Sequence, residues 1–154
     1  MTKTYTGKCY CGEVKWKIEL SDPKEGRTSL CHCLNCKKFF GTEYGITTKV
    51  PWNSFSLFPD SKQPKKHVSS NEGRVLTREF CETCGSPIRE WGGAAEGHFT
   101  YVCYGGLDDE GRKELPPTAE FWLRRREEWC RDILGDDVYR QEELPKAPFA
   151  HSQT

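Results

Sequence analysis

Seven of the nine cysteines in this chain fall into three short groups. The groups are Cys9 with Cys11, Cys31 with Cys33 and Cys36, and Cys81 with Cys84. A Cys-x-x-Cys turn lets two sulfur atoms converge on one metal ion at about 2.3 Å, while neighbouring backbone amides donate hydrogen bonds to the thiolates. Gly12 and Gly85 directly follow two of the groups, and glycine accepts the positive φ angle that such turns often need. The spacing therefore predicts zinc binding, and iron–sulfur ligation is the weaker alternative because no four-cysteine ferredoxin run is present.

Seven ligands divide most simply into one site with four and one site with three. A structural zinc site is closed by four protein ligands, whereas a catalytic site keeps one position open. The triplet within Cys31–Cys36 provides three thiolates, and the two remote pairs would then form the closed site. In the alternative, a histidine completes the second site and both zinc ions are structural. The candidate histidines are His32, His67 and His98.

Composition sets limits on the class of protein and its partners. The 154 residues suit one ordinary domain, whose core is expected to be thin because only 35% of the residues are hydrophobic and the mean hydropathy is −0.79. Basic and acidic residues number 23 each, so the net charge is zero, which argues against nucleic acid or an anionic membrane as a partner. The run Arg124–Arg126 is followed by Glu127 and Glu128 and is predicted to form a solvated face whose charges compensate one another.

The cysteines also bear on the cellular compartment. The first residues lack the apolar segment of about 7–15 residues that a signal peptide needs, and no apolar run approaches the roughly 18 residues of a membrane span. Nine cysteines without a secretion signal indicate a reducing compartment, so we expect free thiols and a cytoplasmic location. Cys103 and Cys130 lie outside the three groups, beside aromatic residues, and are predicted to be small buried hydrophobic residues.

Short strands are predicted to position the cysteine groups. Residues 14–20 alternate strictly between apolar and polar side chains, which is the period of a half-buried strand. Residues 29–41 are predicted to form a strand that enters a tight knuckle and leaves on a short helix. Further strands are predicted within 46–50, 52–57, 74–80, 87–91 and 99–104, with a surface loop or hairpin at 61–73 and a loop at 107–117. Many short strands separated by glycine and proline indicate a small, mainly β domain.

The C-terminal part of the chain fits more than one pattern. Helix propensity favours a helix through Arg124–Arg131, whereas Phe121–Leu123 could equally close a sheet. Residues 135–154 are polar, and we expect this tail to pack on the surface or to be partly disordered. The expected organisation is a zinc domain over 1–134 and a C-terminal tail over 135–154.

The ordered cysteine pattern resembles the glutathione-dependent formaldehyde-activating enzyme family, which also includes centromere protein V. The segments that carry the resemblance are Gly7–Gly12, Cys31–Cys36, Phe80–Gly85 and Gly105–Asp109, together with Phe121, Trp122 and Trp129. The resemblance runs from about Thr6 to Trp129. It implies a β-tent fold with short helical turns and a strand at Phe121–Leu123.

The resemblance also implies the metal ligands and the reaction. Cys9, Cys11, Cys81 and Cys84 would form a structural zinc site, and Cys31, Cys33 and Cys36 would hold a second zinc ion whose fourth position takes water or a ligand thiol. The reaction joins formaldehyde to glutathione as S-hydroxymethylglutathione, which is carbon–sulfur lyase chemistry when read backward. A non-catalytic glutathione carrier and a zinc-stabilised protein-binding module stay as alternatives.

Two features of this sequence differ from the family pattern. The segment after Cys36 is more aromatic than expected, with Phe39, Phe40 and Tyr44, and the tail beyond Trp129 is longer than the family core. Both features could shape a pocket for another carbonyl compound that is bulkier than formaldehyde. The reaction also needs a proton donor, for which no single residue is assigned. The candidates are Glu43, Tyr44, His67, His98 and Asp108.

Overall fold

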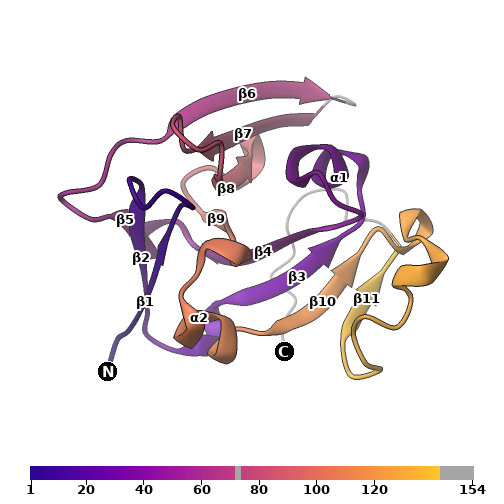
Figure 1. Cartoon of the computed structure of the whole chain (residues 1–154). Helices are drawn as coiled ribbons and strands as arrows, with labels where there is room; N and C mark the ends of the chain where they lie inside the picture. Colours follow the sequence, from indigo (N-terminus) through magenta and orange to yellow (C-terminus); the bar gives the residue numbers. More distant parts are fainter. Residues whose placement is uncertain (72–73, 143–154) are drawn as a thin grey trace.

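The chain forms two sheets and few helices in the computed structural model, which describes residues 1–71 and 74–142 (Figure 1). The smaller sheet has three antiparallel strands in the order β1-β2-β5. These strands span Lys3–Lys8 (β1), Lys15–Leu20 (β2) and Phe55–Leu57 (β5). The expected mainly β fold class is confirmed.

The larger sheet has the order β11-β10-β3-β4-β9-β8-β7-β6 and is antiparallel except where β10 pairs with β3 and with β11. Its strands are Arg27–Cys31 (β3), Gly45–Pro51 (β4), Lys65–Asn71 (β6), Arg74–Phe80 (β7), Pro87–Gly92 (β8), Phe99–Cys103 (β9), Pro117–Phe121 (β10) and Tyr139–Gln141 (β11). The two α-helices are Leu34–Phe40 (α1) and Asp109–Glu114 (α2). Single 3-10 turns span Pro23–Glu25, Trp52–Ser54, Gly93–Ala95, Tyr104–Gly106, Leu123–Arg125 and Glu128–Cys130. Figure 1 shows α1 between the β6–β7 hairpin at one edge of this sheet and strands β10 and β11 at the other.

Most of the strands expected from residue patterns are present. The alternation at 14–20 forms β2, whose Trp16, Ile18 and Leu20 are fully buried. The strand, knuckle and helix expected at 29–41 appear as β3 and α1. The segment 61–73 provides the hairpin strand β6, which pairs with β7. No helix among the described residues is long and apolar enough to cross a membrane.

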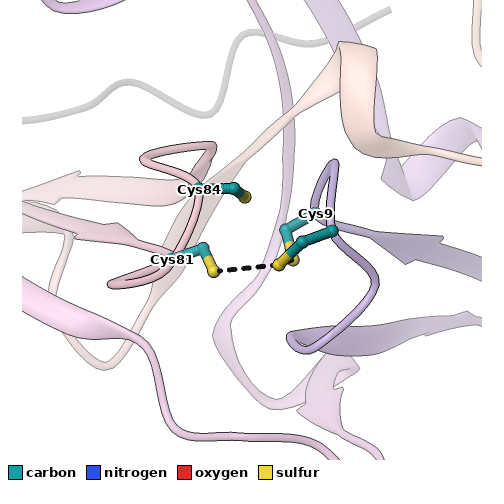
Figure 2. Close-up of side chains that lie close together, drawn as sticks. Cys9, Cys81 and Cys84 are labelled. Atoms are coloured by element: carbon teal, nitrogen blue, oxygen red, sulfur yellow. Dashed lines mark hydrogen bonds between the residues drawn. The ribbon is translucent and has the colours of Figure 1, made fainter.

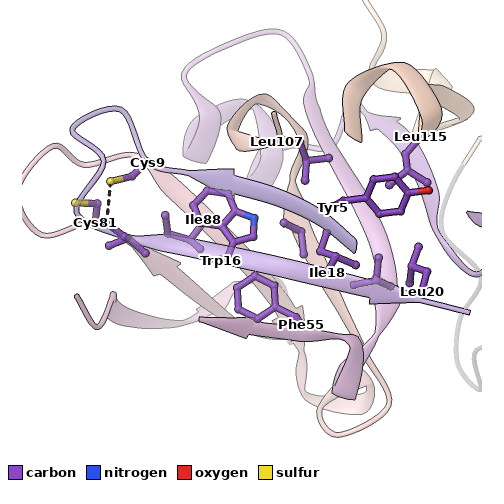
Figure 3. Packing of buried hydrophobic residues seen from close by; sticks show 13 residues of the cluster. Tyr5, Cys9, Trp16, Ile18, Leu20, Phe55, Cys81, Ile88, Leu107 and Leu115 are labelled. Atoms are coloured by element: carbon purple, nitrogen blue, oxygen red, sulfur yellow. Dashed lines mark hydrogen bonds between the residues drawn. The ribbon is translucent and has the colours of Figure 1, made fainter. Parts of the chain in front are cut away.

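The main hydrophobic core fills the space between the two sheets (Figure 3). Trp16 and Ile18 from the small sheet pack in one cluster with Val50, Ile88 and Val102 from the large sheet. Removal of this apolar surface from water is the main favourable term in the folding of such a domain. Cys103 and Cys130 are also buried, which confirms the expectation for these two residues.

The segment 107–117 is not the expected loop, because it contains α2. This helix carries acidic residues in its first turn and basic residues in its last turn, the arrangement that complements a helix dipole. Leu107 and Leu115, which bracket it, are buried in the main core. A helix of six residues is too short to show the helical period of apolar side chains, so the sequence pattern predicted only a loop.

The segment 119–134 also differs from expectation. The predicted helix through Arg124–Arg131 is wrong, because only single 3-10 turns occur there. The strand that the resemblance implies at Phe121–Leu123 is correct only at Phe121, where β10 ends. Trp122 follows in the left-handed region with a φ angle of 61°, which turns the chain away from the sheet.

One arginine of the run Arg124–Arg126 departs from the expected self-compensating face. Arg126 forms an ion pair with the buried Glu120, with Nη1 3.0 Å from Oε2. The guanidinium groups of Arg124 and Arg125 lie 5.1 Å and 5.8 Å from the centre of the Trp122 ring. The pattern of charges in the sequence did not predict these partners, because the chain turns away from the sheet at the left-handed residue Trp122.

The expected C-terminal tail lies partly outside the described residues, since 143–154 are not described. The described part contributes β11, which pairs in parallel with β10. Arg140 of this strand forms an ion pair with Glu120 of β10.

A first prediction tests how tightly Trp16 is packed. A Cβ atom at Gly106 would lie 2.6 Å from Cη2 of Trp16, whereas one at the adjacent Gly105 would meet nothing within 4 Å. We expect Gly106→Ala to lower the free energy of unfolding by about 1–3 kcal/mol, because the buried indole has no free space into which to move. The matched control Gly105→Ala should stay within about 0.5 kcal/mol of the wild type in urea unfolding. Equal stabilities of the two variants would contradict the packing described here.

Candidate metal centres

The first centre lies where hairpin loops of the two sheets meet. Cys9 and Cys11 occupy the loop between β1 and β2, and Cys81 and Cys84 occupy the loop between β7 and β8. The four sulfur atoms all lie within 4.8 Å of one another. Figure 2 shows Cys9 on one loop, with its sulfur facing those of Cys81 and Cys84 on the other. We call this group (Cys9, Cys11, Cys81, Cys84) the four-thiol centre.

The loop backbone is arranged as the sequence predicted. The Val14 amide donates a hydrogen bond to Sγ of Cys9 over 3.2 Å. Gly12 and Gly85 have φ angles of 80° and 73°, the left-handed conformation that glycine adopts without strain. The Tyr10 amide donates to the Ser86 hydroxyl over 3.0 Å and so connects the two loops directly.

The spacing of the four-thiol centre fits a tetrahedral ion. Zinc–sulfur bonds of about 2.3 Å in a tetrahedron place the sulfur atoms about 3.8 Å apart. The Sγ atom of Cys11 lies 3.5 Å from that of Cys9 and 3.7 Å from that of Cys81. The Ser86 hydroxyl, followed by the backbone of Cys11, lowers the pKa of the Cys84 thiol to about 5, which favours the thiolate that binds metal.

The second centre lies at the end of β3 and the start of α1. Cys31 is the last residue of β3, Cys33 is the N-cap of α1, and Cys36 lies in the first turn of the helix. The Cys36 amide donates to Sγ of Cys33 over 3.3 Å, so this thiol serves as the helix cap. The three sulfur atoms lie within 4.8 Å of one another. We call this group (Cys31, Cys33, Cys36) the three-thiol centre.

The thiols of this centre share their protons unequally. Hydrogen bonds from the Cys31 and Cys36 thiols strongly lower the pKa of Cys33. The hydrogen bond with Cys33, together with burial, raises the pKa of Cys31, and hydrogen bonds with Cys31 and Cys33, followed by burial, raise the pKa of Cys36. A thiolate supported by two adjacent thiols is a suitable starting point for a divalent cation, which displaces the remaining protons as it binds.

In the part of the chain that the structure describes, no fourth protein ligand completes the three-thiol centre. Across residues 1–71 and 74–142, no histidine, carboxylate or further cysteine ligand atom lies within 4.8 Å of all three sulfur atoms. His67 and His98 are exposed outside this group. His32 stands between two of the cysteines, but its Nε2 atom lies 2.7 Å from Oε1 of the buried Glu120. The structure therefore places none of the three candidate histidines in this centre.

The buried Glu120 fixes the knuckle that carries the three-thiol centre. It contacts His32 through Oε1 and receives hydrogen bonds through Oε2 from Arg126 at 3.0 Å and Arg140 at 3.1 Å. The His32 amide also donates to the Phe121 carbonyl over 3.1 Å. The network joins the knuckle, β10, the following turn and β11. His32 is thus a positioning residue, which its place between two cysteines did not reveal.

A pocket of about 520 Å³ contains two of the five candidate proton donors, Glu43 and Tyr44. None of the seven clustered cysteines lines it. Glu43 is also bound by Nζ of Lys37 over 2.7 Å. Asp108 accepts a hydrogen bond from the Thr6 hydroxyl. The full lining is Lys8, Tyr10, Phe40, Thr42, Glu43, Tyr44, Ile46, Ser86, Pro87, Cys103, Gly105, Gly106 and Trp129.

Sequence reasoning missed the polar residues that the large sheet places on the face of the three-thiol centre. Strand register aligns Arg27, Lys49, Tyr101, Glu90 and Arg78 across β3, β4, β9, β8 and β7. Cys31 shares this face because it lies four residues from Arg27 on the same strand, and side chains alternate with a period of two. Arg78 donates to Glu90 over 2.8 Å, and its guanidinium lies 4.5 Å from the centre of the Phe39 ring of α1. These residues share no sequence motif, so only the register could reveal them.

Comparisons with known proteins agree with this architecture. A crystal structure of a Rhodobacter sphaeroides protein is similar in fold, with a TM-score of 0.53 and 18% sequence identity, over 75% of this chain and 98% of that one. No curated protein matches the sequence. The family model described as glutathione-dependent formaldehyde-activating enzyme matches residues 4–125. The chain therefore belongs to the glutathione-dependent formaldehyde-activating enzyme family.

Proposed function

We propose that this chain binds two zinc ions and acts as a carbon–sulfur lyase-type enzyme on glutathione adducts of formaldehyde or of another carbonyl compound. The four-thiol centre would be structural and the three-thiol centre would be catalytic. The observation that carries the proposal is that the three-thiol centre has no fourth ligand among the described residues. Family membership gives the substrate class.

The chemistry needs a thiol and a carbonyl compound held side by side. Zinc, when bound, would keep the thiol of glutathione deprotonated. In the synthetic direction a carbon–sulfur bond forms, the carbonyl π bond breaks, and the proton lost by the thiol ends on the carbonyl oxygen, with no net oxidation. Because both reactants are held in one place, the addition becomes effectively intramolecular.

The surroundings of the three-thiol centre supply a further hydrogen-bond donor. Tyr101 lies on the same face of the sheet, two strands from Cys31. Burial, followed by the nearby Glu90 and Cys31, raises the pKa of the Tyr101 phenol above its usual value. The phenol therefore keeps its proton at neutral pH and can donate a hydrogen bond to a bound ligand. No role in proton transfer is assigned to it.

The alternative from another class is a zinc-stabilised binding module. In that case a side chain outside the described residues, or a partner, would close the three-thiol centre. A glutathione carrier would instead bind the thiol without turnover. The experiments below separate these functions.

Metal content gives the most direct test. We expect purified protein to hold about two equivalents of zinc, because each centre has a donor set that fits one ion. Cys36→Ser should hold about one equivalent. Elemental analysis of both proteins measures this, and a single equivalent in the wild type would contradict the assignment of two centres.

The two centres should differ in their effect on stability. A structural zinc site can contribute roughly 10–16 kcal/mol of apparent binding free energy, which matches or exceeds the total stability of about 5–15 kcal/mol for a typical domain. Cys81→Ser should therefore unfold or aggregate, since it opens the centre that joins the two sheets. The matched control Cys130→Ser changes a buried cysteine outside both centres and should keep the fold and both metals. A folded Cys81→Ser variant with full metal content, judged by circular dichroism and elemental analysis, would show that the structural centre is misassigned.

Cobalt substitution tests the open position of the three-thiol centre. We expect glutathione to raise the sulfur-to-cobalt charge-transfer absorption of the wild type, because a fourth sulfur joins three cysteine thiolates. Cys36→Ser should keep the absorption of the four-thiol centre but lose the response to glutathione. Formaldehyde turnover is assayed separately, and binding without turnover would indicate a carrier. If millimolar glutathione and other small thiols leave the wild-type spectrum unchanged, the binding module replaces the enzyme.

A further inference from the structure

Two cations stand next to each other on the face that carries the three-thiol centre. Arg27 of β3 is the register partner of Lys49 of β4, and Lys49 is the register partner of Tyr101 of β9. Register partners point their side chains to the same face of a sheet, and like charges in this position destabilise the pair. An anion bound between the two side chains would remove that repulsion.

Neither cation forms an ion pair within residues 1–71 and 74–142, whereas Arg78 in the same row has Glu90 as its partner at 2.8 Å. The Nε–H group of Arg27 is buried and has no hydrogen-bond acceptor among the described residues. Nζ of Lys49 lies over the ring of Phe99, 3.9 Å from its centre. Burial, followed by the charge of Arg27, lowers the pKa of Lys49. A buried charged donor without an acceptor is costly, so an acceptor from a ligand would stabilise the site.

One of the two cations, Arg27, links the pair to the three-thiol centre. The guanidinium of Arg27 lies 5.0 Å from the centre of the Phe121 ring. Phe121 is the register partner of Cys31 and belongs, with Ala119 and Trp122, to the buried cluster against which Cys31 and Cys33 pack. The guanidinium thus lies against a member of the apolar cluster on which two cysteines of the centre also pack. The polar groups are therefore placed for a ligand whose sulfur and carboxylate are separated by a few bonds.

We propose that Arg27 and Lys49 form a carboxylate-binding subsite that selects thiols, or thiol adducts, in which a carboxylate lies a few bonds from the sulfur atom. The inference rests on the proposed function, because the sulfur is held at the three-thiol centre. Tyr101 adds a neutral hydrogen-bond donor beside the two cations. Arginine and a carboxylate match in geometry, since two parallel N–H groups face two oxygens.

The test compares a thiol with its own esterified form. Cobalt-loaded full-length protein is titrated with glutathione and with glutathione diethyl ester, whose carboxylates are blocked. We expect the wild type to bind glutathione at least about tenfold more tightly than the ester, because hydrogen bonds between charged groups are the stronger ones. Arg27→Gln and Lys49→Met should each lose most of this preference, with unchanged affinity for the ester. Arg27→Lys should retain part of it.

The control for nonspecific charge effects is Lys17→Met. Lys17 lies on β2 of the small sheet and pairs with Glu19 at 2.9 Å, so its removal should leave the preference unchanged. Circular dichroism and metal content of every variant are compared with the wild type. Lys49→Met serves as the second variant if Arg27→Gln does not fold.

Two further ligands separate failure of the subsite from failure of the proposed function. S-methylglutathione keeps both carboxylates but has no thiol, and calorimetry should show that it binds the wild type and binds Arg27→Gln more weakly. If no thiol changes the cobalt spectrum while this binding persists, the subsite stands and the proposed function falls. Equal wild-type affinity for glutathione and its ester overturns the subsite alone. If neither the cobalt spectral change nor the binding of S-methylglutathione is seen, the subsite and the proposed function are both overturned. If glyoxylate, a carbonyl compound with a carboxylate, loses affinity in Arg27→Gln while glutathione does not, the selection of thiols is overturned.

Discussion

The convergence of four thiols from two different sheets is the constraint on which the rest of the structure depends. Cys9 and Cys11 belong to the small sheet, and Cys81 and Cys84 belong to the large one. A cation between them would tie together two hairpin loops that are far apart in the sequence. The chain as a whole has only modest apolar content, so this connection and the packing around Trp16 would act together. The left-handed glycines after Cys11 and Cys84 are the local condition that allows it.

The three-thiol centre depends on a different kind of support. Its cysteines lie close together in sequence, so a strand end and a helix cap are enough to bring them into one group. Their position relative to the sheet is set by Glu120, which contacts His32, Arg126 and Arg140 at once. Because Arg140 belongs to β11, the C-terminal strand takes part in fixing the knuckle. A centre that is held by this network and has no fourth ligand among the described residues would be suited to exchange a ligand without loss of the fold.

Whether a feature could be predicted depends on how far apart in the sequence its interacting residues lie. The knuckles, the alternation of β2 and the grouping of the cysteines depend on neighbours in sequence, and they could be predicted. The row from Arg27 to Arg78 depends on the register of five strands, and sequence spacing contains no record of it. His32 shows the same limit, since its place between Cys31 and Cys33 suggested a ligand, whereas its side chain contacts Glu120. The error at Arg124–Arg131 arose because helix propensity takes no account of the ion pair between Arg126 and Glu120.

The charge of a zinc-loaded three-thiol centre would give the two neighbouring cations a physical purpose. Three cysteine thiolates outweigh the two positive charges of a zinc ion, and a thiol ligand would add a further negative charge. That surplus would make the ligand thiolate easier to release, and a released thiolate would be a better nucleophile than one held by a metal. Release is useful only if the ligand stays in place. A carboxylate held by Arg27 and Lys49 would keep the ligand beside the carbonyl compound while its sulfur is free, which preserves the entropic advantage of a bound reactant. On this view the three-thiol centre and the cation pair would form one site, in which a bound ion would keep the ligand thiol deprotonated and the cations would retain the ligand.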